Sequence, residues 1–229
     1  AEALLRWHHP VRGLIPPDQF IPIAEDAGLM PEIGLWVLER AIADAARWKG
    51  LGVSVNIASS QLMQAGFQSD LKVILDANGY PAEKLVLEIT ETQILDQVEK
   101  TKQVLKELRA IGINCAMDDF GTGYSSLSAL AELPADILKI DRSFLSGKAS
   151  EAPSAAMLEG ILGLAGKLRL ETIVEGIEDP AQLALVRRLG CRLGQGYLLS
   201  RPGPAPQIEA LLAARARLQP QAGALASDS

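Results

Sequence analysis

Two adjacent carboxylates, Asp118 and Asp119, carry the clearest chemical signal in this sequence. They directly follow the apolar pair Ala116-Met117 and precede a glycine-rich stretch, residues 120–124. Two like charges at the end of a buried strand are unfavourable unless cations lie close by. The doublet therefore indicates a cation site. For the doublet alone, a turn or a helix N-terminus, where a single aspartate is common, stays open as an alternative.

Three more oxygen-bearing side chains favour the cation site. Asn56 and Glu88 interrupt apolar runs, and Glu175 ends another. Glu91 lies three residues beyond Glu88. Oxygen ligands delivered by four strands to one rim are hard to explain without a polyvalent cation, which takes carboxylate and carbonyl oxygens.

Lys139 is flanked by Leu138 and Ile140 in a short apolar run. A lysine in such a run needs a carboxylate partner or a shifted pKa, and both are at home in an active site. An ordinary structural ion pair between Lys139 and Asp141 is the alternative.

The nitrogen and sulfur ligands are too few for a zinc site. His8 and His9 are the only histidines, and Cys115 and Cys191 stand far apart. Oxygen must therefore hold the metal, which favours Mg²⁺ or Mn²⁺. Two isolated cysteines are typical of buried, reduced thiols in a cytoplasmic protein.

Short apolar runs with β-branched residues predict the strands that position these side chains. A further strand is expected around residues 3–5. The others are predicted at residues 53–57, 85–89, 113–117, 137–140, 172–175 and 194–198.

Helical patterns lie between the runs, at residues 31–49, 97–111, 155–168 and 180–189. Trp36 and Trp48 are expected in the core. Alternating strands and helices predict an α/β fold with a mainly parallel sheet. Polar residues at the strand ends are typical of a TIM-like (β/α)₈ barrel. Only seven strands are found, so we expect the barrel to lack its first strand here.

Composition limits the partners. The net charge of −6 disfavours binding to a nucleic-acid polymer. No apolar run reaches the roughly 20 residues of a membrane span. We expect one domain over residues 1–218 and a disordered tail over residues 219–229, which has no hydrophobic periodicity.

The motifs, taken in order, resemble those of the EAL domain family. The resemblance begins at Glu2-Ala3-Leu4-Leu5-Arg6 and covers residues 1 to about 212. It continues through Phe20-Ile21-Pro22-Ile23-Ala24-Glu25, Val55-Asn56-Ile57, Leu87-Glu88-Ile89-Thr90-Glu91, Asp118 to Leu127, Leu138 to Phe144, Val174-Glu175-Gly176-Ile177-Glu178 and Gln195-Gly196-Tyr197.

The resemblance implies a (β/α)₈-like barrel that hydrolyses the bacterial messenger cyclic di-GMP to linear pGpG with two Mg²⁺ or Mn²⁺ ions. Such an activity lowers the level of the messenger in the cell. The family has a strand before the Glu-Ala-Leu motif that this sequence does not contain.

The resemblance also implies roles for single residues. One metal would be held by Glu2, Asn56, Glu88 and Asp118. Asp118 would bridge to a second metal, held with Asp119 and Glu175. The catalytic set would be Lys139, which contacts the nucleophilic water, Glu175, and Glu91, which orders the loop after Asp119. The substrate would be bound by Arg6, Asp141, Gln195 and Tyr197.

As partners, the resemblance implies cyclic di-GMP and, in the parent protein, upstream sensory or GGDEF domains that could anchor it to a membrane. A homodimer is also compatible, since some family members link dimerisation to activity through the loop after Asp119. Two alternatives stay open: a receptor that binds cyclic di-GMP without turnover, and a different metal-dependent barrel enzyme such as a carbon–carbon lyase.

Overall fold

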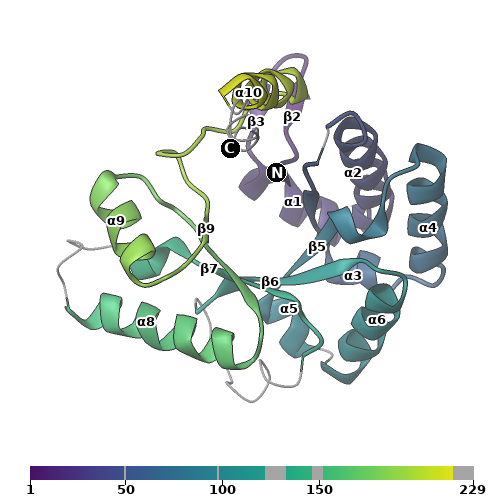
Figure 1. Cartoon of the computed structure of the whole chain (residues 1–229). Helices are drawn as coiled ribbons and strands as arrows, with labels where there is room; N and C mark the ends of the chain where they lie inside the picture. Colours follow the sequence, from purple (N-terminus) through teal and green to yellow (C-terminus); the bar gives the residue numbers. More distant parts are fainter. Residues whose placement is uncertain (49, 97, 122–132, 146–151, 219–229) are drawn as a thin grey trace, which may run out of the picture.

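The structure is a computed structural model of the chain that describes residues 1–48, 50–96, 98–121, 133–145 and 152–218 (Figure 1). Most of the glycine-rich stretch after Asp119 and the tail expected at residues 219–229 lie outside the described residues.

Seven parallel strands form the main sheet, and they are the seven strands expected from the sequence. Their order in the sheet is β1-β4-β5-β6-β7-β8-β9, so neighbours in the sheet follow each other along the chain. The strands are β1 (Glu2–Ala3), β4 (Val53–Asn56), β5 (Leu85–Thr90), β6 (Asn114–Phe120), β7 (Ile137–Ile140), β8 (Glu171–Val174) and β9 (Leu193–Gly194). Within the described residues, β1 and β9 are the two edges of the sheet.

Helices lie around the outside of this sheet, as Figure 1 shows. The four predicted helices are found with shifted ends: α2 (Met30–Ala45), α6 (Val98–Ala110), α8 (Ala152–Lys167) and α9 (Pro180–Arg188). The sequence analysis did not place the other elements. These are the antiparallel hairpin of β2 (Trp7–His9) and β3 (Gly13–Ile15), the helices α1 (Pro17–Asp26), α3 (Ser59–Leu62), α4 (Phe67–Asn78), α5 (Glu91–Asp96) and α10 (Ala205–Leu218), and the 3₁₀ turns η1 (Ala82–Lys84) and η2 (Arg142–Leu145).

The sequence explains both the strands and the helix ends. All four residues of β7 are buried, as expected for a parallel strand covered on both faces. At α9, the Asp179 side chain accepts hydrogen bonds from the backbone N–H groups of Ala181 and Gln182, while Pro180 occupies the first turn. This capping box fixes where the helix begins.

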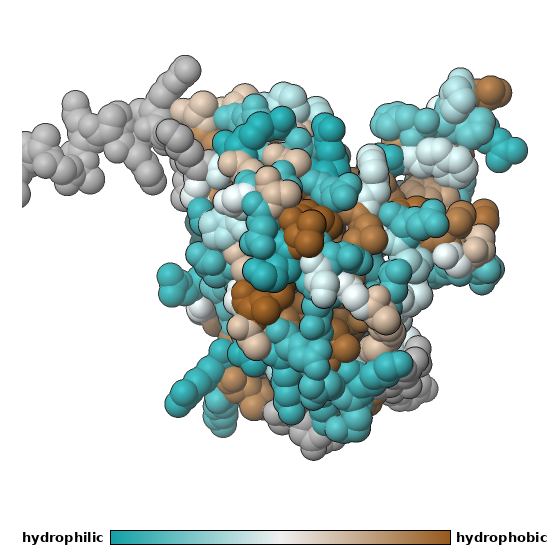
Figure 2. Space-filling view, turned by 90° about the vertical axis from the view of Figure 1, so that its right-hand side faces the viewer, coloured by the Kyte–Doolittle hydropathy of each residue, from teal (hydrophilic) through white to brown (hydrophobic). Residues whose placement is uncertain are grey.

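One core prediction is wrong. Trp36 lies on α2 with 57% of its surface exposed, whereas Trp48 packs partly against the core. Figure 2 views the side of the molecule that carries α2, α4 and α6, and hydrophobic residues appear there as separate spots among hydrophilic ones. Val73 on α4 is another exposed apolar residue, 66% exposed. Single exposed apolar side chains of this kind are common on soluble proteins.

Helices α2 and α3 pack unusually closely. Gly34 of α2 faces Gln61 of α3, and a methyl group on Gly34 would overlap the Gln61 side chain. Gln61 is 1% exposed, and its amide atoms have no hydrogen-bond partner among the residues described. The missing side chain at position 34 therefore allows the two helices to approach.

Two further expectations can be compared with the structure. Cys115 and Cys191 are both buried and form no disulfide. Among the helices described here, none combines the length and the apolar character that crossing a membrane requires.

Candidate functional site

Polar side chains in the seven strands of the main sheet, or directly after them, gather toward the carboxyl ends of those strands. Because the strands are parallel, these ends share one edge of the sheet, where barrel enzymes carry their catalytic residues. The residues are Glu2 in β1, Asn56 at the end of β4, Glu88 in β5, Asp118 and Asp119 in β6, Lys139 in β7, Glu175 directly after β8 and Gln195 directly after β9.

Lys139 lies at the centre of these side chains. Its Nζ is 2.8 Å from Glu88 Oε2, 3.0 Å from Asp118 Oδ2 and 2.8 Å from Glu175 Oε1. Glu2 Oε2 is 3.8 Å away. Lys139 is 1% exposed, so its ammonium group depends on these carboxylates to compensate the loss of water.

An irregularity in β6 turns the aspartate doublet. The pairing of β6 with β7 shifts register between Met117 and Phe120. Asp119 has a φ of 54°, a left-handed conformation uncommon outside glycine. Bulges of this kind re-aim side chains and occur often next to active sites. Here the doublet gives one buried carboxylate, Asp118, and one exposed carboxylate, Asp119.

Glu2 connects the two edges of the sheet. Its Oε1 accepts a hydrogen bond from Asn56 Nδ2 at 3.0 Å, and its Oε2 accepts one from Gln195 Nε2 at 2.6 Å. The second bond joins residues that are 193 positions apart in the chain. Side chains of β1 and of the segment after β9 therefore meet although their strands do not pair.

The buried charges perturb one another. Burial raises the pKa of Glu88 to about 7, although the ammonium of Lys139 partly opposes this shift. Burial disfavours the charged form of Lys139, but Glu88, Glu2, Asp118 and Glu175 outweigh that effect and raise its pKa. Lys139 is therefore an ammonium group throughout the physiological range, which makes it a donor.

The pKa values of Asp119 and Glu175 are raised as well. Although Asp119 is exposed to solvent, nearby protein atoms displace part of the water around its carboxylate, and this and the charges of Asp118 and Asp141 raise its pKa. The pKa of Glu175 is raised by burial, with Lys139 opposing the shift. More negative charge is gathered here than one ammonium compensates, and additional cations would relieve the excess.

The donor atoms fit a divalent cation with a preference for oxygen. Carboxylate oxygens of Asp118, Asp119 and Glu175 lie within 4.8 Å of one another. Nitrogen and sulfur ligands are absent from this group, and hard cations such as Mg²⁺ and Mn²⁺ suit such a set.

Glu91 holds the end of β6 instead of joining the carboxylate cluster. It begins α5, is 5% exposed, and its Oε2 accepts a hydrogen bond from the Gly121 N–H at 3.2 Å. Gly121 has a φ of 96° and lies against the ring of Phe144, so a larger residue would not fit there. Glu91 thus contacts the backbone of the residue that directly follows β6.

Two further predicted site residues, Arg6 and Asp141, form hydrogen bonds outside the carboxylate cluster around Lys139. Arg6 donates to the carbonyl oxygen of Leu5 at 2.8 Å, and in the described part of the chain it has no ion pair with the cluster. Asp141 Oδ1 accepts from the Ser143 N–H at 2.8 Å, so the alternative Lys139–Asp141 pair is not observed.

Tyr197 is 53% exposed and lies under the guanidinium group of Arg201, with 4.6 Å between Arg201 Cζ and the ring centroid. The sequence analysis missed Arg201. No periodicity links a tyrosine and an arginine four positions apart outside a helix, so the sequence offered no signal for this contact.

Parallel strands surrounded by helices, with an acidic cluster around a lysine at their carboxyl ends, define a TIM-barrel-like protein with a site suited to divalent cations. The sequence profile of the EAL domain matches residues 1–202. The chain belongs to the EAL domain family.

Two relatives from Pseudomonas aeruginosa are similar over most of this chain. The bifunctional diguanylate cyclase/cyclic di-GMP phosphodiesterase MucR is 41% identical over 217 residues, which are 93% of this chain and 32% of the relative. The cyclic di-GMP phosphodiesterase NbdA is 41% identical over 218 residues, 93% of this chain and 28% of the relative. The chain thus spans about a third or less of these relatives.

Solved structures agree with the fold. The PaMucR phosphodiesterase in complex with c-di-GMP superposes with a TM-score of 0.85 at 41% identity, covering 90% of this chain and 86% of that one. The FimX EAL domain from Pseudomonas aeruginosa bound to c-di-GMP gives a TM-score of 0.83 at 29% identity, covering 88% and 83%.

Proposed function

We propose that this chain hydrolyses one phosphodiester bond of cyclic di-GMP to give linear pGpG, using two divalent cations, and so lowers the level of the messenger. The observation that carries the proposal is the cluster of carboxylates around Lys139 at the carboxyl ends of the strands. The substrate comes from the relatives, two of which are named as cyclic di-GMP phosphodiesterases. We further propose that residues 1–218 form one phosphodiesterase domain.

The proposed metal ligands are divided between two ions, Mg²⁺ or Mn²⁺. Glu2, Asn56, Glu88 and Asp118 would hold the first ion through their side-chain oxygens. Asp118 would also contribute to the second ion, together with Asp119 and Glu175. The convergence of Asp118, Asp119 and Glu175 supports the second group. When bound, such ions stabilise negative charge on the phosphate and make water a better nucleophile.

Lys139 is proposed to orient the attacking water. Because the surrounding carboxylates raise its pKa, Lys139 is suited to donate a hydrogen bond to the water, which leaves a carboxylate as the proposed acceptor of the proton. Glu175, 2.8 Å from Lys139 Nζ and with a raised pKa, is suited to accept it. Glu91 contributes indirectly, through its hydrogen bond to the backbone of Gly121.

The proposed substrate contacts come from four residues around the cluster. Gln195 already contacts Glu2, and Asp141 influences the charge of Asp119, which supports placing both at the site. Arg6 offers paired donors for phosphate oxygens, and Tyr197 offers an aromatic face.

The test is to incubate the purified chain with cyclic di-GMP and Mg²⁺ or Mn²⁺ and to separate the products by chromatography. We expect metal-dependent pGpG, and no product from the Asp118→Asn/Asp119→Asn variant. Glu2→Ala should also lose turnover while circular dichroism shows a retained fold. Folded wild-type protein that binds cyclic di-GMP but produces no pGpG would replace this proposal with the receptor alternative.

A further inference from the structure

The segment after β9 is held firmly against the segment after β8. The Gln195 N–H donates to the Val174 carbonyl at 2.9 Å, and the Ile177 N–H donates to the Gln195 carbonyl at 3.0 Å. Gly196 lies so close to the Ile177 backbone that any side chain at position 196 would overlap it. The Leu198 N–H donates to the Ile177 carbonyl at 3.0 Å. The backbone on both sides of Tyr197 is therefore fixed.

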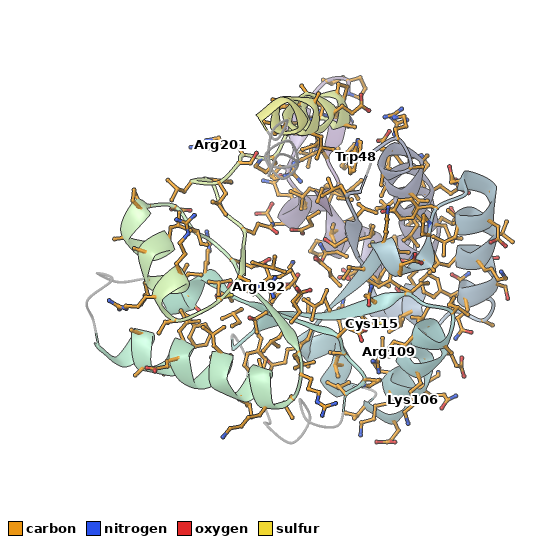
Figure 3. All side chains as sticks on the ribbon, in the orientation of Figure 1. Trp48, Lys106, Arg109, Cys115, Arg192 and Arg201 are labelled. Carbon is orange, nitrogen blue, oxygen red and sulfur yellow. The ribbon has the colours of Figure 1, made fainter. Side chains whose placement is uncertain are left out.

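The side chain of Tyr197 makes a different contact. The guanidinium of Arg201 lies over the Tyr197 ring at 4.6 Å from its centroid, within the range of a cation–π interaction. Figure 3 labels Arg201 on the segment that runs from β9 to α10. Arg201 thus covers one face of a ring that is still 53% exposed.

The segment that carries Tyr197 lies at the margin of the carboxylate cluster, through Gln195. Tyr197 is two residues beyond Gln195, whose amide nitrogen is 2.6 Å from Glu2 Oε2. A half-exposed aromatic ring beside such a site can stack on a flat base, and every nucleobase offers a flat face. The substrate that we propose contains two guanines, so a fixed ring at this margin would help to hold one of them.

We propose that Arg201 is a positioning residue, which orients Tyr197 so that the exposed part of its ring stacks on a purine base of the cyclic dinucleotide. This inference rests on the proposed function, because the substrate is taken from it. Arg201 acts through Tyr197 and makes no contact with the reacting phosphate.

A double-mutant cycle tests this mechanism. We expect Arg201→Ala to raise the KM for cyclic di-GMP roughly three- to tenfold, with kcat changed less than about twofold. In a Tyr197→Ala background, Arg201→Ala should have no further effect, since two residues that act as one unit are not additive. Arg201→Lys, which keeps a cation near the ring, should recover part of the lost affinity. Arg188→Ala, on the exposed side of α9, is the matched control.

Binding of the metal alone separates this role from general damage to the site. The rise in melting temperature caused by Mn²⁺ should be the same in Arg201→Ala as in the wild-type chain. A full effect of Arg201→Ala in the Tyr197→Ala background would show direct contact with substrate and would overturn the inference. An unchanged KM in Arg201→Ala would also overturn it. Inactivity of the wild-type chain toward cyclic di-GMP would instead contradict the proposed function itself.

Discussion

At the scale of single residues, Lys139 dominates the site because it is a buried cation among acids. Three carboxylate oxygens lie within 3.0 Å of its Nζ, and a fourth lies at 3.8 Å. Moving an ammonium group out of water is costly, and only such partners compensate for it. The same contacts keep mutually repelling carboxylates together. Lys139 therefore affects both the stability of the barrel and the geometry of its proposed metal ligands.

Replacing Lys139 with Met should reveal both effects. The variant keeps a side chain of similar length but leaves Glu88, Asp118 and Glu175 without their shared cation. We expect a loss of stability of about 3–5 kcal/mol, measured by urea unfolding in the presence of a chelator, and loss of pGpG formation. Lys100→Met, at an exposed position of α6, is the control and should change stability by less than about 0.5 kcal/mol. Equal stability of the two variants would argue against the role assigned to Lys139.

Sequence reasoning located the charged residues of the site but not which carboxylates pair with Lys139. Glu88 could be found because it interrupts an apolar run, Glu175 because it ends one, and Asp118 and Asp119 because they follow one, whereas Glu2 came only from the family resemblance. The partner of Lys139 could not be identified from the sequence, which left an ion pair with Asp141 open as the alternative. That choice depends on the register of β5, β6 and β7, which brings residues 51 and 21 positions apart into contact. Neither separation is visible in a local pattern.

At the scale of helices and strands, two local features could not be predicted from the sequence: the register shift in β6 and the close contact of α2 with α3. The register shift in β6 sends Asp118 and Asp119 into different environments. The two aspartates give no sequence signal from which that register shift could be predicted. The contact of α2 with α3 depends on Gly34, and a glycine inside a predicted helix is normally only a weak point. Trp36 was wrongly expected in the core because helical spacing does not tell which face of α2 meets the sheet.

Gly34→Ala should destabilise the protein although alanine is the better helix former. The added methyl group overlaps the Gln61 side chain, which is enclosed and cannot move freely. We expect a loss of about 1–3 kcal/mol, as for other overpacked cores. Gly163→Ala in α8, where a methyl group meets nothing within 4 Å, should instead stabilise by roughly 0.5–1 kcal/mol. Thermal unfolding of both variants measures the difference, and a stabilising effect at both positions would contradict the packing argument.

At the scale of the whole molecule, the order of the seven strands could be predicted because parallel βα units follow one another around a barrel. The β2–β3 hairpin could not be predicted, since its strands are only three residues long. The site depends on the whole molecule, because its residues come from strands all along the sheet. A ligand that binds there should stabilise the whole fold.

Divalent cations should therefore raise the melting temperature of the full chain. We expect Mg²⁺ or Mn²⁺ at about 100 times its dissociation constant to add about 2.7 kcal/mol, and a chelator to reverse the effect. Differential scanning calorimetry measures the shift. In Asp118→Asn/Asp119→Asn/Glu175→Gln, the cation should have little effect, because the three converging carboxylates are gone. A similar shift in this variant would place the cation elsewhere.

The hydrogen bond between Glu2 and Gln195 also bears on how the protein is made. A ribosome synthesises Gln195 193 residues after Glu2, so the β1 carboxylate lacks this partner until that stretch has been made. Contacts between distant parts of a chain are slow to form, and they close late in folding. A chain whose synthesis is interrupted before Gln195 cannot make this link. A nascent chain that ends before Gln195 would thus lack the hydrogen bond that joins the two edges of the sheet.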